Sequence, residues 1–155
     1  MDEDSLPDEE ILPLSKAVLL LLEECRMVLP GIQALFGFQM IAVFNSRFAD
    51  ALSRTEQHLH LLAIGMTALA VALIMTPAAY HRQSHPQKVT LRFLRISTRL
   101  VLLSMPPLVL SLCTEFYLVS RLILHGTAAA VGSALLMGIF VILWFVLPRL
   151  QNRIR

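Results

Sequence analysis

The sequence predicts an all-α integral membrane protein in which four transmembrane helices form one bundle. The chain has 155 residues, of which 56% are hydrophobic and only 15% are charged. A soluble domain of this size usually carries ~25% charged residues and cannot bury so much apolar surface in its core. Four stretches approach the ~20 apolar residues that a helix needs to cross a bilayer. They do not alternate polar with apolar residues, which favours helices over barrel strands.

The predicted spans cover most of the chain, at residues 27–44, 61–80, 100–117 and 126–147. Helical periodicity begins ahead of the first span, so we expect one long helix that starts near Leu14 and carries charges in its first turns. After that span, Phe48 and Leu52 share a face that predicts a short interfacial helix. Residues 1–13 are acidic and contain two prolines, so we expect a flexible tail followed by a single domain at 14–155.

The basic residues predict the orientation of the helices. Of the 13 lysines and arginines, ten fall in the two terminal segments and the middle loop, and three fall in the other two loops. Because cytoplasmic segments are enriched in basic residues, both termini are expected in the cytoplasm, in a multi-pass protein of the cell (inner) membrane. The opening residues are acidic rather than basic, so no cleavable signal is expected.

A stripe of basic residues leads into the third span. Its members recur at steps of four, three and four residues, which places them on one helix face: Lys88, Arg92, Arg95 and Arg99. Such a stripe is typical of an anchor to anionic lipid head groups, where each basic residue contributes ~1 kcal/mol. The alternative is a docking surface for the acidic tail or a regulatory partner. The bilayer is therefore a predicted partner, whereas the net charge of +2 is too small to predict nucleic acid.

Small residues predict where helices approach one another, because they let two backbones come close. They recur every four residues in the fourth span and in the second span, at Gly126, Ala130, Ala134 and Gly138 and at Ala68, Ala72 and Thr76. These stripes serve either contacts within one chain or contacts between chains. A homo-oligomer is the expected state.

Polar residues inside a span need a partner or a function, because polar groups in the bilayer are costly. Pro30 and Gly31 predict a kink in the first helix. Gln33 lies beside them, either as an interhelical hydrogen-bonding group or as part of a polar path. Glu115 is the one carboxylate within a span. It either lies at the interface, where it reaches water or pairs with Arg121, Arg47 or Arg54, or it serves as a proton or cation site.

Neither an enzyme nor a cofactor is predicted. Cys25 and Cys113 are far apart in sequence and lack the spacing of metal ligands. The histidines fall near the ends of the spans, where interfacial histidines are common. No nucleophile–base set and no phosphate-binding loop is present in the sequence.

The run from Glu24 to Gln39, ECRMVLPGIQALFGFQ, resembles the first-span signature of an uncharacterised bacterial family of small four-span membrane proteins. In that family a Glu-x-Arg pair precedes Leu-Pro-Gly-x-Gln and an aromatic-rich run. Arg47-Phe48 and the segment at 76–82, TPAAYHR, agree as well. Members are sometimes labelled sodium:proton antiporters. The resemblance implies that the positions to carry over are Glu24, Arg26, Pro30, Gly31, Gln33, Pro77, His81 and Arg82.

Four of these positions fall at the inner ends of the first two predicted helices. Adjacent antiparallel helices would bring Glu24 and Arg26 together with His81 and Arg82 as one ionisable cluster. We expect Arg26 to pair with Glu23, Glu24 or another acid at that edge, because a charge near hydrocarbon needs a partner. A structural clasp explains this cluster as well as a proton relay does.

Two functions follow from these observations. The first is a small transporter or channel subunit that moves protons or small cations as an oligomer, since four helices barely enclose a path. The second is a non-catalytic interaction or assembly protein that uses the small-residue stripes and charged cytoplasmic surfaces.

Overall fold

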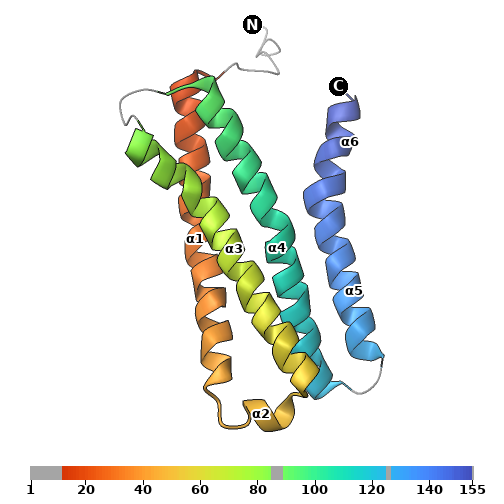
Figure 1. Cartoon of the computed structure of the whole chain (residues 1–155). Coiled ribbons are helices and arrows are strands. Elements are labelled where there is room, and N and C mark those ends of the chain that lie inside the picture. Colours follow the sequence, from red (N-terminus) through yellow and green to blue (C-terminus); the bar gives the residue numbers. More distant parts are fainter. Residues whose placement is uncertain (1–11, 85–88, 125–126, 155) are drawn as a thin grey trace, which may run out of the picture.

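The computed structural model describes residues 12–84, 89–124 and 127–154. Within these residues every regular element is helical (Figure 1). The elements in chain order are α1 (Leu14–Val43), α2 (Phe48–Ala51), α3 (Arg54–Ser84), α4 (Leu91–Ile123), α5 (Ala128–Val141), the π-helical turn η1 (Ile142–Val146) and α6 (Leu147–Ile154). The protein is therefore all-α, as the sequence predicts.

Most of the predicted elements are present. Helix α1 begins at Leu14 and continues through Pro30, and a short helix, α2, follows it as predicted. Helices α3 and α4 contain the second and third predicted spans and extend beyond them at both ends. Thr90 caps α4 by accepting a hydrogen bond from the Phe93 backbone N–H at 3.2 Å. The fourth predicted span corresponds to α5, η1 and the start of α6, apart from residue 126, which lies outside the described residues.

Three helical stretches are long and apolar enough to cross a membrane, at Arg54–Gln83, Leu91–Ile123 and Ala128–Leu150. The shortest has 23 residues, or about 35 Å at 1.5 Å per residue, against a hydrocarbon core of about 30 Å. Helix α1 is not among these three. Its first half carries Lys16, Glu23, Glu24 and Arg26. The structure thus supports a membrane protein with three candidate spans.

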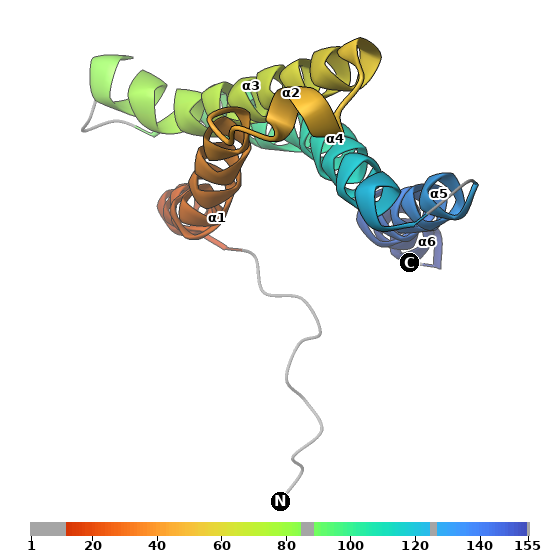
Figure 2. The same cartoon turned by 90° about the horizontal axis from the view of Figure 1, so that it is seen from below.

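Helix α3 lies between α1 and α4 and contacts both (Figures 1 and 2). Helix α5 packs mainly on α4, and Figure 2 shows α1 and the α5–α6 stretch lying apart on either side. The described buried core therefore comes from α1, α3 and α4, at Leu21, Cys25, Ile32, Ala70, Ile74 and Leu108. Of the α5 residues, Ala129 is buried.

The faces buried within the chain lie beside the predicted small-residue stripes. On α3 the buried face is formed by Ala63, Thr67, Ala70 and Ile74, whereas Ala68, Ala72 and Thr76 are exposed. On α5 the contact with α4 includes Ala129, Gly132 and Ser133, whose Oγ donates to the Cys113 carbonyl at 2.7 Å; Ala130 and Ala134 are exposed. In both helices a second set of small residues lies beside the predicted stripe. Only neighbouring helices decide which set is buried.

The helices run up and down, so alternate connections lie at opposite ends. The start of α1, the end of α3, the start of α4 and the end of α6 lie at one end (Figure 1). The α1–α3 connection, which contains α2, lies at the opposite end, which we call the α2 end. Both ends of the described chain thus lie on the same side of the molecule.

Candidate functional site

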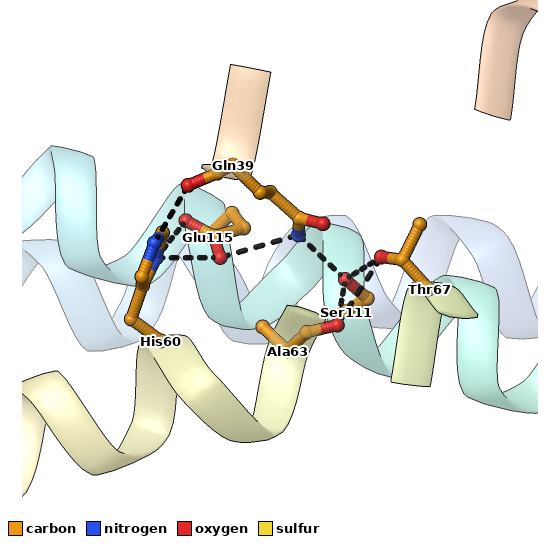
Figure 3. A network of polar contacts seen from close by, with 6 residues as sticks. All are labelled: Gln39, His60, Ala63, Thr67, Ser111 and Glu115. Atoms are coloured by element: carbon orange, nitrogen blue, oxygen red, sulfur yellow. Dashed lines mark hydrogen bonds and ion pairs between the residues drawn. The ribbon is translucent and has the colours of Figure 1, made fainter. Parts of the chain in front are cut away.

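A network of polar side chains connects the three core helices toward the α2 end (Figure 3). Its members come from α1, α3 and α4: Gln39, His60, Thr67, Ser111 and Glu115. The first four are buried, and the Glu115 side chain is 18% exposed. Helical spacing explains the convergence, because residues seven apart on α3 and four apart on α4 share a face. All five polar side chains therefore point into the space between the helices.

His60 and Glu115 are paired at the centre of this network. The His60 Nδ1 atom lies 2.9 Å from Glu115 Oε1 and 3.1 Å from Oε2. The other ring nitrogen, Nε2, lies 3.0 Å from the backbone carbonyl oxygen of Gln39. A carbonyl oxygen can only accept, so Nε2 carries a hydrogen and donates it. The hydrogen bond between Nδ1 and the carboxyl group then needs one further proton, which resides on either partner.

The Gln39 side-chain amide extends the network into the protein. Its Nε2 donates to Ser111 Oγ at 2.9 Å and to Glu115 Oε1 at 3.2 Å. Its Oε1 is buried and has no hydrogen-bond partner among the described residues. An unpaired buried acceptor costs about 1–3 kcal/mol. The amide is held by its donor side, and its acceptor oxygen is buried without a partner among the described residues.

Two hydroxyl groups complete the network. Ser111 Oγ and Thr67 Oγ1 lie 2.6 Å apart, and they lie 2.9 Å and 3.1 Å from the Ala63 carbonyl oxygen, respectively. Each hydroxyl has one hydrogen, so when Thr67 donates to Ser111, Ser111 donates to Ala63. The reverse arrangement satisfies the same groups. This pair of hydroxyls binds α4 to α3 and can reverse its direction of donation.

The ion pair is accessible from the α2 end through a cavity of about 280 Å³. Its walls include Asn45 and Arg47 from the α1–α2 connection and Phe48 from α2, and His60 and Glu115 line it as well. The Phe48 ring lies 5.2 Å from the His60 ring, centroid to centroid. The network is therefore buried between helices on one side and borders an opening on the other.

A second ion pair at the α2 end has a structural role. Glu56 Oε1 lies 2.6 Å from Arg121 Nη1. Its other oxygen, Oε2, accepts hydrogen bonds from the Ser53 backbone N–H at 2.8 Å and from Ser53 Oγ at 2.5 Å. The Ser53-x-x-Glu56 pattern is that of a capping box, which satisfies free backbone donors at a helix start. Arg121 is thus engaged by Glu56, whereas Glu115 pairs with His60; of the alternatives for Glu115, pairing with Arg121 is not the one found.

The residues of the predicted ionisable cluster lie on α1 and α3, toward the end of the molecule opposite α2. Arg26, His81 and Arg82 line one pocket of about 310 Å³ between α1 and α3. Glu24 is exposed and does not line it. At about 100° per residue, Glu24 lies on the far side of α1 from the face that carries Cys25 and Arg26 toward α3. Among the described residues the ion pairs are His60–Glu115 and Glu56–Arg121, so the expected partner of Arg26 is not found there.

The other predicted positions lie apart from the polar network around His60 and Glu115. Pro30, Gly31 and Gln33 are exposed on α1, and Pro77 is fully buried on α3. Six residues of helix separate Gln33 from Gln39 by about 120°, which explains why Gln39 alone faces the core. Arg92, Arg95 and Arg99 are exposed on α4, and Lys88 lies outside the described residues.

These features define a class: an all-helical protein with three helices apolar enough to cross a membrane and a polar network buried between its core helices. The chain belongs to DUF6328, a family of unknown function whose model matches residues 14–148. The sequence-based expectation of an uncharacterised family is thereby confirmed. No curated protein and no solved structure matches the chain. The family description states neither a number of spans nor an activity.

Proposed function

We propose that the protein is a small four-span transporter subunit of the cell (inner) membrane that exchanges protons for small cations. The observation that carries this proposal is the His60–Glu115 pair, whose hydrogen bond contains one transferable proton at the wall of a cavity. Ionisable residues between transmembrane helices commonly mark ion and proton pathways. Glu115 is the residue proposed to exchange the proton, and His60 is its partner.

Charge arithmetic supports exchange at this pair. With its shared proton, the pair is either a carboxylate beside an imidazolium or a carboxylic acid beside a neutral imidazole, and both arrangements have zero net charge. Loss of that proton leaves one negative charge on Glu115 at the cavity wall. A small cation would then be attracted to the carboxylate. Proton and cation thus compete for one site, as exchange requires.

Gln39 provides a means of coupling binding to helix movement. Its amide donates to Ser111 and to the carboxyl group of Glu115, so it links α1 to α4. A carboxylate is a stronger acceptor than a carboxylic acid, because charge-assisted hydrogen bonds are roughly twice as strong. Protonation of Glu115 therefore loosens the contact between α1 and α4. A transporter uses such a change to open its site alternately to the two sides.

The topology proposed with this function includes α1 as a fourth span and places both termini in the cytoplasm. The cavity beside His60 then opens outward, and the pocket that contains Arg26 opens inward. A core of three packed helices leaves little room for a continuous path, so the active form is proposed to be a homo-oligomer.

Proton flux in liposomes tests the proposal. Purified protein is reconstituted with an internal pH-sensitive dye, and a sodium or potassium gradient is imposed. Flux driven by the cation gradient is expected for the native protein and should be lost with Glu115→Gln. Glu56→Gln is the matched control, because it alters a carboxyl group at the same end that does not contact the network. Absence of flux under both gradients, or full flux with Glu115→Gln, would refute the transport proposal.

The second candidate function is assembly of a larger membrane complex without transport. The observation in its favour concerns the exposure of α5 and the residues that follow it. The most apolar stretch of Ala128–Leu150 contains no residue that is buried within the chain. That helix has a face available for another protein. Crosslinking in native membranes separates the two candidates: one dominant foreign partner supports assembly, and crosslinks between copies of this chain support an oligomeric transporter.

A further inference from the structure

A groove of about 560 Å³ lies between α4 and the η1–α6 segment, at the end opposite α2. Its apolar walls include Leu103 and Pro106 from α4 and Trp144 and Phe145 from η1. Arg99 on α4 and Arg149 on α6 also line it. Its volume lies within the range of about 300–1,000 Å³ that is usual for small-molecule sites.

The local structure explains why a groove forms here and not along the whole α4–α5 contact. Near the α2 end the two helices pack closely, and a Cβ atom added at Gly132 would lie 3.5 Å from the Phe116 ring. Farther along, the helices diverge (Figure 1), and bulky residues replace the small ones. The π-helical turn Ile142–Val146 contains Trp144 and Phe145. Single π-helical turns within α-helices occur frequently at functional sites.

Trp144 is a fixed part of the groove rather than a loose surface side chain. Its ring packs edge-to-face against Phe140 at 5.0 Å between centroids, and it contacts the buried core cluster. Its position relative to α4 is therefore set by the core. A ligand in the groove would contact a wall that is already in place.

The two arginines give the groove its chemical character. Both are exposed, and neither is in an ion pair with any residue that the structure describes. Arg99 belongs to the α4 wall and Arg149 to the α6 wall. Both lie toward the same end of the molecule, because α4 begins and α6 ends there. A guanidinium group beside hydrocarbon requires a counter-charge or water, and its planar geometry suits phosphate oxygens. A phosphate above an apolar chain satisfies both parts of this groove.

We propose that the groove binds one anionic phospholipid, with the phosphate between Arg99 and Arg149 and an acyl chain along Leu103, Pro106 and Trp144. This site differs from a general anchor on the basic stripe, because Arg92 and Arg95 do not line the groove. It is also independent of the proposed transport, since neither His60 nor Glu115 takes part. A second copy of the chain is the other occupant that the groove could accept, and the experiment distinguishes the two.

Tryptophan fluorescence provides a direct measurement, because Trp144 is the only tryptophan in the chain. The full-length protein in mixed micelles is titrated with phosphatidylglycerol brominated on its acyl chains, and separately with brominated phosphatidylcholine. We expect the anionic lipid to quench Trp144 at lower concentration. The Arg99→Gln/Arg149→Gln variant should lose this preference by about fivefold for each arginine, the usual effect of one basic residue at an anionic surface. The Arg92→Gln/Arg95→Gln variant is the matched control and should retain most of the preference.

Three results would overturn the proposal. The first is equal quenching of the native protein by both lipids. The second is an equal loss of preference in the two double variants, which would indicate anchoring by the whole basic stripe. The third is protection of Trp144 from both lipids together with crosslinks between α6 segments, which would indicate a second copy in the groove. Both double variants change exposed side chains, so both are expected to fold. Circular dichroism of each variant is the check on folding.

Discussion

His60 Nδ1 lies 2.9 Å from Glu115 Oε1 and links α3 to α4 at a depth where α1 also contributes a partner. The same imidazole ring donates from Nε2 to the Gln39 carbonyl oxygen, so one side chain connects three helices. Histidine can make these contacts because each of its two ring nitrogens can form a hydrogen bond at the same time. Packing and proton chemistry thus depend on the same residue.

Removing the carboxyl group of Glu115 should destabilise the core. Glu115→Ala leaves His60 Nδ1 without its partner and one Gln39 N–H without its acceptor, at an expected cost of about 1–3 kcal/mol. Glu115→Gln retains an acceptor oxygen and should cost less. Thermal unfolding in detergent measures both variants, with Glu24→Ala as the exposed control, which should change stability by about 0.5 kcal/mol or less. Equal melting temperatures for Glu115→Ala and Glu24→Ala would show that the pair does not stabilise the core.

Ser111→Ala should weaken the contact between α3 and α4. The Ser111 hydroxyl accepts from Gln39 and bonds with Thr67 and the Ala63 carbonyl, all of which are buried. An interhelical hydrogen bond in a membrane contributes about 0.6–2 kcal/mol. Thr98→Ala is the control on the same helix, because the exposed Thr98 hydroxyl donates only to the Leu94 carbonyl of its own helix. A loss of stability that is no greater for Ser111→Ala than for Thr98→Ala would contradict the prediction.

The capping box at the start of α3 predicts a local effect. Ser53→Ala removes a hydrogen-bonding partner of Glu56, and a lost cap typically costs about 1 kcal/mol. Hydrogen exchange should accelerate in the first turn of α3 and remain unchanged near Thr67. Arg121→Gln should have the smaller effect, because the Arg121 side chain is 52% exposed and exposed ion pairs contribute little. Faster exchange throughout α3 would mean that Ser53 supports more than the cap.

Gly132 and Gly138 should respond differently to the same substitution. A Cβ at Gly132 lies at ordinary contact distance from Phe116, so Gly132→Ala should be tolerated and Gly132→Leu should push α5 from α4. Overpacking typically costs about 1–3 kcal/mol. At Gly138 a Cβ would have no neighbour within 4 Å, so Gly138→Leu serves as the control. If Gly138→Leu lowers the melting temperature as much as Gly132→Leu does, the α4–α5 contact has been assigned to the wrong face.

Cysteine labelling tests the proposed topology of α1. Single cysteines are introduced at Leu12, Asn45 and Val89, which lie ahead of α1, after α1 and ahead of α4, respectively. A membrane-impermeant maleimide should label Asn45→Cys in intact cells and should label the other two only after permeabilisation. Labelling of Leu12→Cys and Asn45→Cys from the same side would show that α1 does not cross the membrane. The native Cys25 and Cys113 are buried and provide the background.

The sequence by itself determined the helices and their approximate limits. Pro13 disfavours the helical conformation in the residue before it, which agrees with a start of α1 at Leu14, and long apolar runs identify α3, α4 and α5. These are local properties, since hydropathy and backbone preference depend on residues near in sequence. Antiparallel neighbouring helices place their ends at one level, and Arg26, His81 and Arg82 line one pocket at such a level.

Only the tertiary structure decided which face of each helix is buried, and with it the candidate site. Several stripes on α3 are equally small and apolar, and the rotation of α3 selects Ala63, Thr67 and Ala70 over Ala68 and Ala72. The same rotation turns His60 inward, although its position near a span end suggested the surface. Glu115 had nearby arginines as candidate partners, but Glu56 engages Arg121 and leaves the carboxyl group of Glu115 to His60. Helix rotation is set by contacts between residues 21 to 76 positions apart, which no local pattern encodes.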